Sequence, residues 1–195
     1  NYTKALEYLN GALEIAKELA ENHKIPPFLW FDQQAEEALN LYCSVFPNSS
    51  ITNLTRLPNG AVMTAGVQLG GQKFAALNGG PMFKFNPSIS FFVVCETEAE
   101  IDLAWQKLLE GGSEMMPFDK YPWSEKYGWL QDRFGLSWQL SWGKLAEVGQ
   151  KFTPTLMFVG AQHGRAEEAI NFYSTVFKKL FPFKFIKKHA YILPK

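Results

Sequence analysis

Histidine is scarce in this chain of 195 residues and absent from its whole central part. The only histidines are His23, His163 and His189, so the stretch from residue 25 to residue 142 contains none. Histidine and carboxylate side chains are the usual ligands of catalytic divalent metals. A site of three or four histidine and glutamate ligands therefore cannot be assembled within that stretch.

An excess of one charge, long apolar runs and a cysteine framework are lacking as well. The 19 basic and 19 acidic residues cancel, which predicts no basic face for nucleic acid and no polybasic membrane patch. No apolar run approaches the ~18 residues that a transmembrane helix needs. The two cysteines, Cys43 and Cys95, predict buried, reduced thiols in a cytoplasmic protein.

Two similar successions of a strand, a helix and short strands follow one another along the chain. The first opens with an apolar strand at 27–31 and a helix at 35–46, whose apolar residues recur at helical spacing. Three strands separated by turn sequences follow it. They are predicted at 50–57, 61–69 and 73–77.

The second succession opens with the strand I-S-F-F-V-V-C at 89–95. Its helix begins at Glu98, buries Ile101 and Trp105, and stops at Gly111. Three strands complete it, at 115–117, 127–131 and 136–142, with Asp132 and Arg133 forming the hairpin turn before the last one. Both halves therefore read as βαβββ modules.

Four motifs lie in order along these modules: F-L-W-F-D-x-x-A-E-E-A, A-L-N-G-G-P-x-F-K-F-N, S-F-x-V-x-C-E-T and G-W-L-x-D-R-F-G-x-S-W-Q. With them the chain resembles the PhnB-like, demethylubiquinone methyltransferase-named branch of the vicinal oxygen chelate superfamily, which also holds glyoxalases, dioxygenases and bleomycin-resistance proteins. The resemblance implies an α+β fold in which the paired modules curve a mixed sheet around a cavity. One fold hosts many chemistries, so the activity must be argued from the site.

The resemblance also places the positions that bind metal in other members. The carboxylate that ends the second module in those relatives corresponds to Gln139, and the histidine that opens it falls near Ser88 or Ser90. The carboxylate that ends the first module falls near Asn78. These residue types are poor ligands for divalent metals, so we expect neither an obligatory metal nor another cofactor.

A polar and aromatic cavity is what remains of the expected site. Strand alternation and the resemblance direct six side chains toward it, the aromatic ones to stack on a ligand and the polar ones to orient it. The six are Trp30, Asn78, Ser90, Phe92, Trp129 and Gln139. The alternative is that these side chains satisfy one another and fill the interior without a ligand. Lys84, Tyr121, Trp123 and Tyr127 form either a loop over the cavity mouth or an aromatic contact between two copies.

The name of the branch suggests methyl transfer, which the residues do not favour. A nucleotide-type methyl donor ordinarily needs a glycine-rich loop between a strand and a helix. The glycine pairs at 70–71, 79–80 and 111–112 fall instead at hairpin turns or at a helix end.

Both ends of the chain extend beyond the paired modules at 25–145. Residues 1–24 predict an amphipathic helix whose apolar stripe needs a partner surface. At 153–195 the start of the first module recurs, because P-T-L-M-F repeats P-F-L-W-F and A-E-E-A-I-N-F-Y-S-T-V-F repeats A-E-E-A-L-N-L-Y-C-S-V-F. This segment reads as the truncated start of a second such domain plus a tail. Burial of its apolar surface favours a homodimer, with exchange of the segment as one route.

Three functions are compatible with these patterns. The first is a metal-independent protein that binds a small organic molecule of unidentified structure. The second is a metal-dependent lyase, dioxygenase or transferase whose site is completed at a dimer interface by residues such as His163 or Glu96. The third is a structural or regulatory dimer module led by the N-terminal helix. We favour the first, because it explains the missing ligands.

Overall fold

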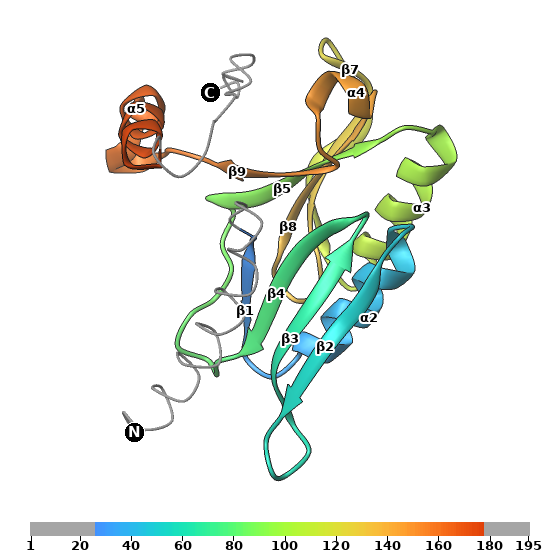
Figure 1. Ribbon diagram of the computed structural model, residues 1–195. Coiled ribbons are helices and arrows are strands. Elements are labelled where there is room, and N and C mark those ends of the chain that lie inside the picture. The colour runs from blue at the N-terminus through green and yellow to red at the C-terminus, as the bar shows by residue number, and fades with distance from the viewer. Residues whose placement is uncertain (1–25, 178–195) are drawn as a thin grey trace.

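The structure, a computed structural model, describes residues 26–177 (Figure 1). The first module contains one helix, α2 (Ala35–Val45), and a four-stranded sheet of order β1-β4-β3-β2. Its strands are β1 (Phe28–Phe31), β2 (Ser50–Arg56), β3 (Val62–Leu69) and β4 (Gln72–Asn78). Strand β1 pairs with β4 in parallel, and the other neighbours are antiparallel.

The second module repeats this arrangement with the helix α3 (Glu98–Leu109). Its strands are β5 (Ile89–Cys95), β6 (Ser113–Tyr121), β7 (Ser124–Gln131) and β8 (Ser137–Trp142). Together with β9 (Phe152–Leu156) they form a sheet of order β6-β7-β8-β5-β9, in which β5 and β8 are parallel. The predicted α+β fold of two tandem βαβββ modules is confirmed, with the strands divided between two sheets.

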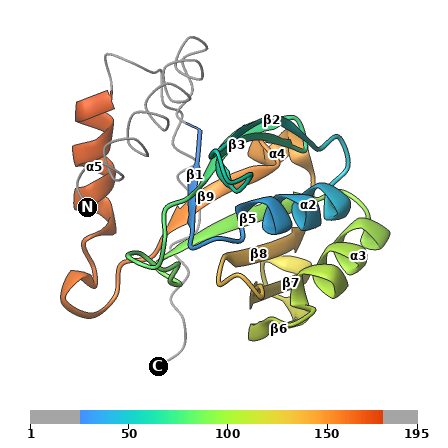
Figure 2. The ribbon, with the colours of Figure 1, turned by 90° about the horizontal axis from the view of Figure 1, so that it is seen from below.

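The fifth strand of the second sheet comes from the repeated segment. After the short helix α4 (Leu145–Val148), strand β9 (Phe152–Leu156) pairs antiparallel with β5. A 3-10 turn, η1 (Gly160–Gln162), and helix α5 (Ala166–Phe177) follow. Figure 2 shows α2 and α3 side by side against the sheets, whereas α5 stands apart from them. The expected helix at 1–24 lies outside the described residues.

Local sequence explains where the helices form. In α2 the five buried residues recur on one side of the helix: Ala35, Ala38, Leu39, Tyr42 and Val45. Helix α3 begins at the N-cap residue Thr97, in a variant of the capping box. The Thr97 hydroxyl accepts a hydrogen bond from the Glu100 backbone N–H, and the Glu100 carboxylate accepts one from the Glu96 N–H.

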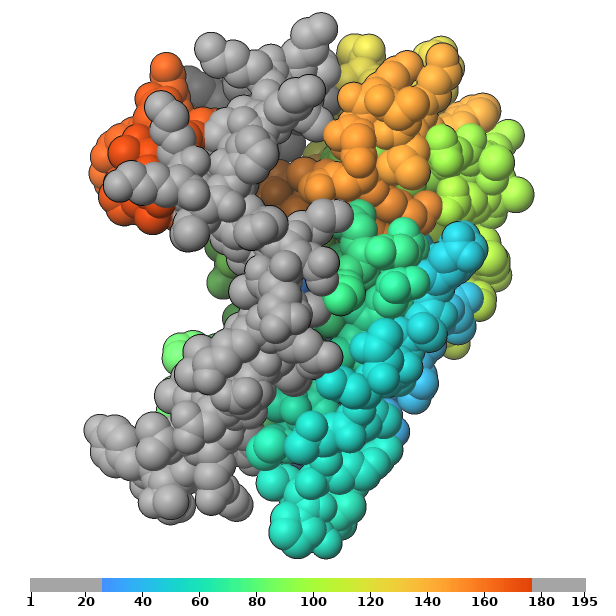
Figure 3. All heavy atoms as spheres, in the orientation of Figure 1, coloured from blue at the N-terminus to red at the C-terminus, as the bar shows by residue number. Residues whose placement is uncertain are grey.

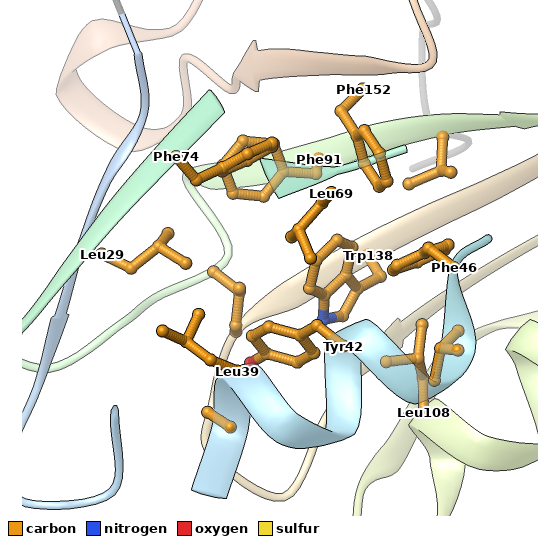
Figure 4. Packing of buried hydrophobic residues seen from close by; sticks show 14 of the residues in the cluster. Leu29, Leu39, Tyr42, Phe46, Leu69, Phe74, Phe91, Leu108, Trp138 and Phe152 are labelled. Atoms are coloured by element: carbon orange, nitrogen blue, oxygen red, sulfur yellow. The ribbon is translucent and has the colours of Figure 1, made fainter. Parts of the chain in front are cut away.

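An aromatic core joins the two modules. Trp138 of β8 is fully buried and lies 5.0 Å from the Tyr42 ring of α2, measured between ring centroids (Figure 4). Phe46 and Phe152 lie close on its other sides. Because these rings come from both modules and from β9, the start of the repeated segment is part of the same core. The domain division at 25–145 and 153–195 stays a prediction.

Candidate functional site

Four of the predicted ligand-binding residues share one face of the second sheet. Trp129 of β7, Gln139 of β8 and Phe92 of β5 are direct neighbours across the strands. Ser90 lies two residues from Phe92 on the same face. Phe91, one residue away, belongs to the core on the opposite face. We call Ser90, Phe92, Trp129, Ser137 and Gln139 the polar face of the second sheet.

A chain of hydrogen bonds crosses this face. The Tyr127 hydroxyl donates to Oε1 of Gln139 over 2.8 Å, and Nε2 of Gln139 donates to Oγ of Ser90 over 2.7 Å. Ser90 is only 2 % exposed. Both ends of the Gln139 amide are therefore engaged, and Ser90 is held as an acceptor whose own proton points elsewhere.

Trp129 is fixed in the same way. Its indole N–H donates to the Ser137 hydroxyl over 2.7 Å, and both residues are buried. Farther along β8, the Ser141 hydroxyl lies 3.1 Å from that of Ser124. The serines of β8 received no assigned role in the sequence prediction, and Tyr127 was assigned to the aromatic loop rather than to this face. The sequence could have identified the two serines. Ser137 and Ser141 alternate with apolar residues in step with Gln139, which places them on the same face of the strand.

The predicted aromatic loop is a hairpin instead. Tyr121 ends β6, Tyr127 lies in β7, and Trp123 occupies the turn between them. The Tyr121 and Trp123 rings stack at 4.9 Å between centroids, and Tyr127 meets both edge-on. Lys84 is not part of this hairpin and belongs to the connection between β4 and β5.

The remaining two predicted residues lie in the first sheet and on opposite faces of it. Trp30 donates its indole N–H to the Gly80 carbonyl and meets Phe83 edge-on at 5.1 Å. Asn78 faces α2, where its Oδ1 accepts from the Ala35 N–H over 2.8 Å. Its amide nitrogen donates to the Val62 carbonyl. Both ends of the Asn78 amide are thus occupied in holding the start of α2.

A buried acid network links the modules, and the sequence did not predict it. Asp132 is 3 % exposed, and Oδ2 accepts from the Tyr42 hydroxyl and the Trp138 indole. Oδ1 accepts from the backbone N–H groups of Phe134 and Leu136, so the predicted hairpin turn is confirmed. Burial raises the pKa of Asp132, against the effect of these hydrogen bonds.

Neither cysteine has the environment of a nucleophile. Cys95 is fully buried, and burial raises its pKa to about 12. Cys43 is half-buried, less than predicted, and burial raises its pKa as well. Both are free thiols.

The side chains of residues 26–177 do not supply a set of metal ligands. Within residues 26–177 no group of three histidine, cysteine, aspartate or glutamate side chains comes together. Glu96 accepts from the Leu145 N–H with its Oε1, which holds the start of α4. His163 follows η1 on the surface. Between residues 26 and 177, no helix is long and apolar enough to cross a membrane.

Comparisons with known proteins agree with this architecture. The family model described as 3-demethylubiquinone-9 3-methyltransferase matches residues 23–141. The PhnB protein of Bacillus cereus is 41% identical with a TM-score of 0.60, over 62% of this chain and 99% of that one. A Pseudomonas aeruginosa protein at 22% identity and a TM-score of 0.54, over 61% and 96% of the two chains, shares the fold. No match was found among curated proteins.

Proposed function

The chain belongs to the 3-demethylubiquinone-9 3-methyltransferase family, and on that premise we propose that it binds a small organic molecule on the polar face of the second sheet, without an obligatory metal. The observation that carries this proposal is the Tyr127–Gln139–Ser90 chain of hydrogen bonds. It holds an amide and a hydroxyl in fixed orientation, and the amide lies between two aromatic side chains on the neighbouring strands. Few placed polar groups among apolar ones are typical of small-molecule sites.

The hydrogen-bond directions indicate the ligand chemistry. Because Ser90 accepts from Gln139, its own proton is oriented toward an acceptor outside this pair. A carbonyl, carboxylate or phosphonate oxygen supplies such an acceptor. Phe92 and Trp129 flank Gln139 on the neighbouring strands and suit an aromatic or apolar body.

The other two residues of the predicted site take different parts in the proposal. Trp30 extends the aromatic surface on the first sheet and is kept as a ligand contact. Asn78 acts indirectly, because its amide is used at the start of α2. The free thiols suit the cytoplasm as the place of action.

Metal-dependent chemistry is less well supported. Gln139 stands where the resemblance expects a carboxylate ligand, and its amide oxygen already accepts from Tyr127. An enzyme completed by a second copy needs residues such as Glu96 or His163. The Glu96 carboxylate is engaged with α4, and no observation directs His163 toward a polar face.

The connections between strands and helices argue against methyl transfer from a nucleotide-type donor. Neither β1–α2 nor β5–α3 contains a glycine, and the second connection supplies the Thr97 cap. The glycine-rich turn that usually receives a nucleotide phosphate is therefore absent from the strand-to-helix junctions of the two βαβββ modules.

The proposal is tested by measuring metal content and ligand binding on the same sample of purified protein. Elemental analysis of purified protein is followed by tryptophan-fluorescence titrations with Mg²⁺, Mn²⁺ and Zn²⁺, and then with a panel of aromatic carboxylates and aromatic ketones. We expect substoichiometric metal, no response to the ions, and saturable quenching by members of the panel. A stoichiometric metal, or a panel without any saturable response, would overturn the proposal.

Two variants locate the binding site. Gln139→Ala removes the central amide, and we expect it to weaken panel binding by ~10-fold, as loss of one well-placed hydrogen-bonding group does. Trp142→Phe is the matched control, because Trp142 lies on the opposite face of β8 and donates to the Glu96 carbonyl. Equal weakening in both variants would place binding elsewhere.

A further inference from the structure

The repeated segment widens the polar face of the second sheet. Strand β9 pairs with β5 so that Thr153 lies directly opposite Phe92, and Thr155 directly opposite Ser90. Residues that are directly opposite in an antiparallel pair share one face of the sheet. The two threonines of β9 therefore belong to the face that carries the proposed ligand site.

Strand β9 is held firmly in this position. Phe152 is fully buried, and the Gln72 side chain accepts from its N–H over 2.7 Å and donates to its carbonyl over 3.0 Å. Lys151 pairs with Glu100 and donates to the Val94 carbonyl. In Figure 3 the start of the repeated segment, in orange, lies against the first sheet, in blue-green. The threonines of β9 thus have a fixed place beside β5.

Two neighbouring hydroxyls on this face have protons to donate. Ser90 accepts from Gln139, and within residues 26–177 its own proton meets no acceptor. Among the same residues the Thr155 hydroxyl has one contact, at 3.4 Å to the Thr153 carbonyl of its own strand. That distance is longer than an ordinary O–H···O hydrogen bond. Neither hydroxyl is therefore committed as a donor within the described part of the chain.

The spacing of these hydroxyls suits a single shared oxygen atom. The Cβ atoms of directly opposite residues lie ~4.5–5.5 Å apart, and an oxygen ~2.7 Å from each hydroxyl spans such a separation. Burial differs between the two positions, because Ser90 is 2 % exposed whereas Thr155 is only half-buried. A ligand oxygen therefore reaches the pair from the side of β9.

The charge of the face selects the kind of oxygen. The residues of the polar face are uncharged, and the threonines of β9 add no charge. At its margin, Lys151 is already paired with Glu100, and Asp119, opposite Tyr127 on β6, is itself acidic. A carboxylate bound here would lose its hydration without a free described cation to pair with. An uncharged carbonyl avoids that cost.

We propose that the hydroxyls of Ser90 and Thr155 together donate to one carbonyl oxygen of an uncharged ligand, such as a ketone, an ester or an amide. This contact rests on the proposed function, because it belongs to the same site. It adds that the repeated segment supplies part of the site and that the preferred ligand carries no charge. Phe92, between Gln139 and Thr153 on the neighbouring strands, then lies beside the body of the ligand.

Three probes of similar size isolate the carbonyl group. They are p-hydroxyacetophenone, p-ethylphenol, which lacks the carbonyl oxygen, and p-hydroxybenzoate, which carries a negative charge near neutral pH. Calorimetry with the full chain measures the binding of each. We expect the ketone to bind at least ~10-fold more tightly than either of the others, as two neutral hydrogen bonds allow. A carboxylate that binds as tightly as the ketone would overturn the assignment to an uncharged ligand.

A substitution on β9 tests the donor. Thr155→Val removes the hydroxyl and keeps the shape of the side chain. We expect it to weaken binding of the ketone by ~5-fold, as the loss of one hydrogen bond does, and to leave binding of p-ethylphenol unchanged. Thr55→Val is the matched control, because Thr55 is an exposed threonine of β2 in the first sheet. It should change neither affinity, and urea unfolding confirms that both variants keep the core.

The possible outcomes distinguish this contact from the proposed function. If the wild type binds the ketone and Thr155→Val retains that affinity, β9 supplies no hydrogen bond and the contact is disproved, whereas the proposed function stands. Equal weakening of the ketone and of p-ethylphenol in Thr155→Val has the same meaning. If the wild type binds none of the aromatic ketones and carboxylates, both proposals are overturned.

Discussion

The Tyr42 hydroxyl donates a 2.7 Å hydrogen bond to the Asp132 carboxylate, and this buried contact joins the helix of the first module to the β7–β8 turn of the second. Trp138 donates to the same oxygen and packs against the Tyr42 ring (Figure 4). A polar contact at the centre of an aromatic core fixes how the modules meet, because neither partner has water as an alternative.

Tyr42→Phe removes one donor from the buried carboxylate and keeps the ring. We expect a loss of ~1–3 kcal/mol in the free energy of unfolding, because Asp132 is left with an unfilled acceptor. Urea unfolding measures it. Tyr173→Phe is the matched control, since Tyr173 is the equivalent residue of α5 and is exposed; it should change stability by less than ~0.5 kcal/mol. Equal losses would show that the buried hydroxyl of Tyr42 contributes no more to stability than the exposed hydroxyl of Tyr173.

The Asp132 carboxyl gives stability a specific pH dependence. Burial is the largest cause of its raised pKa, so the folded protein binds this proton more tightly than the unfolded chain. The resulting contribution of Asp132 to the free energy of unfolding is fully present below its ordinary pKa of 3.8. It is lost as pH rises through the pKa of the folded protein. The variant Asp132→Asn has no carboxyl at this position and therefore lacks this pH-dependent contribution. The unfolding free energy of wild type relative to Asp132→Asn should therefore fall as pH rises from ~4 toward neutrality, and a difference that rises with pH would contradict it.

Strand β5 shows what the sequence predicts well. Its predicted bounds, 89–95, are those observed, because a mostly apolar run of aromatic and β-branched residues bordered by polar residues has few alternatives. Strand β6 was predicted to end at Pro117 but continues to Tyr121. It is the edge strand of its sheet, where a proline costs no ladder hydrogen bond. Proline signals a boundary only when both sides of a strand are paired.

The candidate site was predictable only where it depends on local strand geometry. Alternation along β5 and β8 placed Ser90, Phe92 and Gln139 on one face, because a strand has a fixed period. Asn78 was assigned to the same site, yet its amide holds the start of α2. Which partner a polar side chain takes depends on residues distant in sequence, as with Tyr42 and Asp132, and no local pattern encodes that choice.

Gln72 anchors the repeated segment through the backbone of Phe152. Gln72→Ala leaves both the N–H and the carbonyl of Phe152 without these partners, so we expect a loss of ~1–3 kcal/mol in the free energy of unfolding. Gln68→Ala, also a half-buried glutamine of the first sheet, is the control. Hydrogen exchange of residues 152–156 should accelerate in Gln72→Ala alone; unchanged exchange would mean that β5 is sufficient to hold β9.

Cys95 should be inert in the folded protein. Burial raises its pKa to about 12, so almost no thiolate exists near pH 8. With Ellman's reagent at pH 8, Cys43 should react first, because it is half-buried, and Cys95 only as the protein unfolds. Cys43→Ser isolates the Cys95 signal. Rapid reaction of that variant without denaturant would show that the second sheet opens at β5.

Gly79 tests whether Trp30 is held where the site proposal needs it. A Cβ at position 79 would lie 2.2 Å from the Trp30 ring, so Gly79→Ala must displace the indole that donates to Gly80. Overpacking of this kind costs ~1–3 kcal/mol in the free energy of unfolding. Gly143→Ala is the control, since its nearest contact is Val94 at 3.9 Å. If Trp30 contacts the ligand, Gly79→Ala also shifts tryptophan emission and weakens binding of aromatic carboxylates. If Trp30 has a purely structural role, Gly79→Ala lowers stability and leaves binding intact.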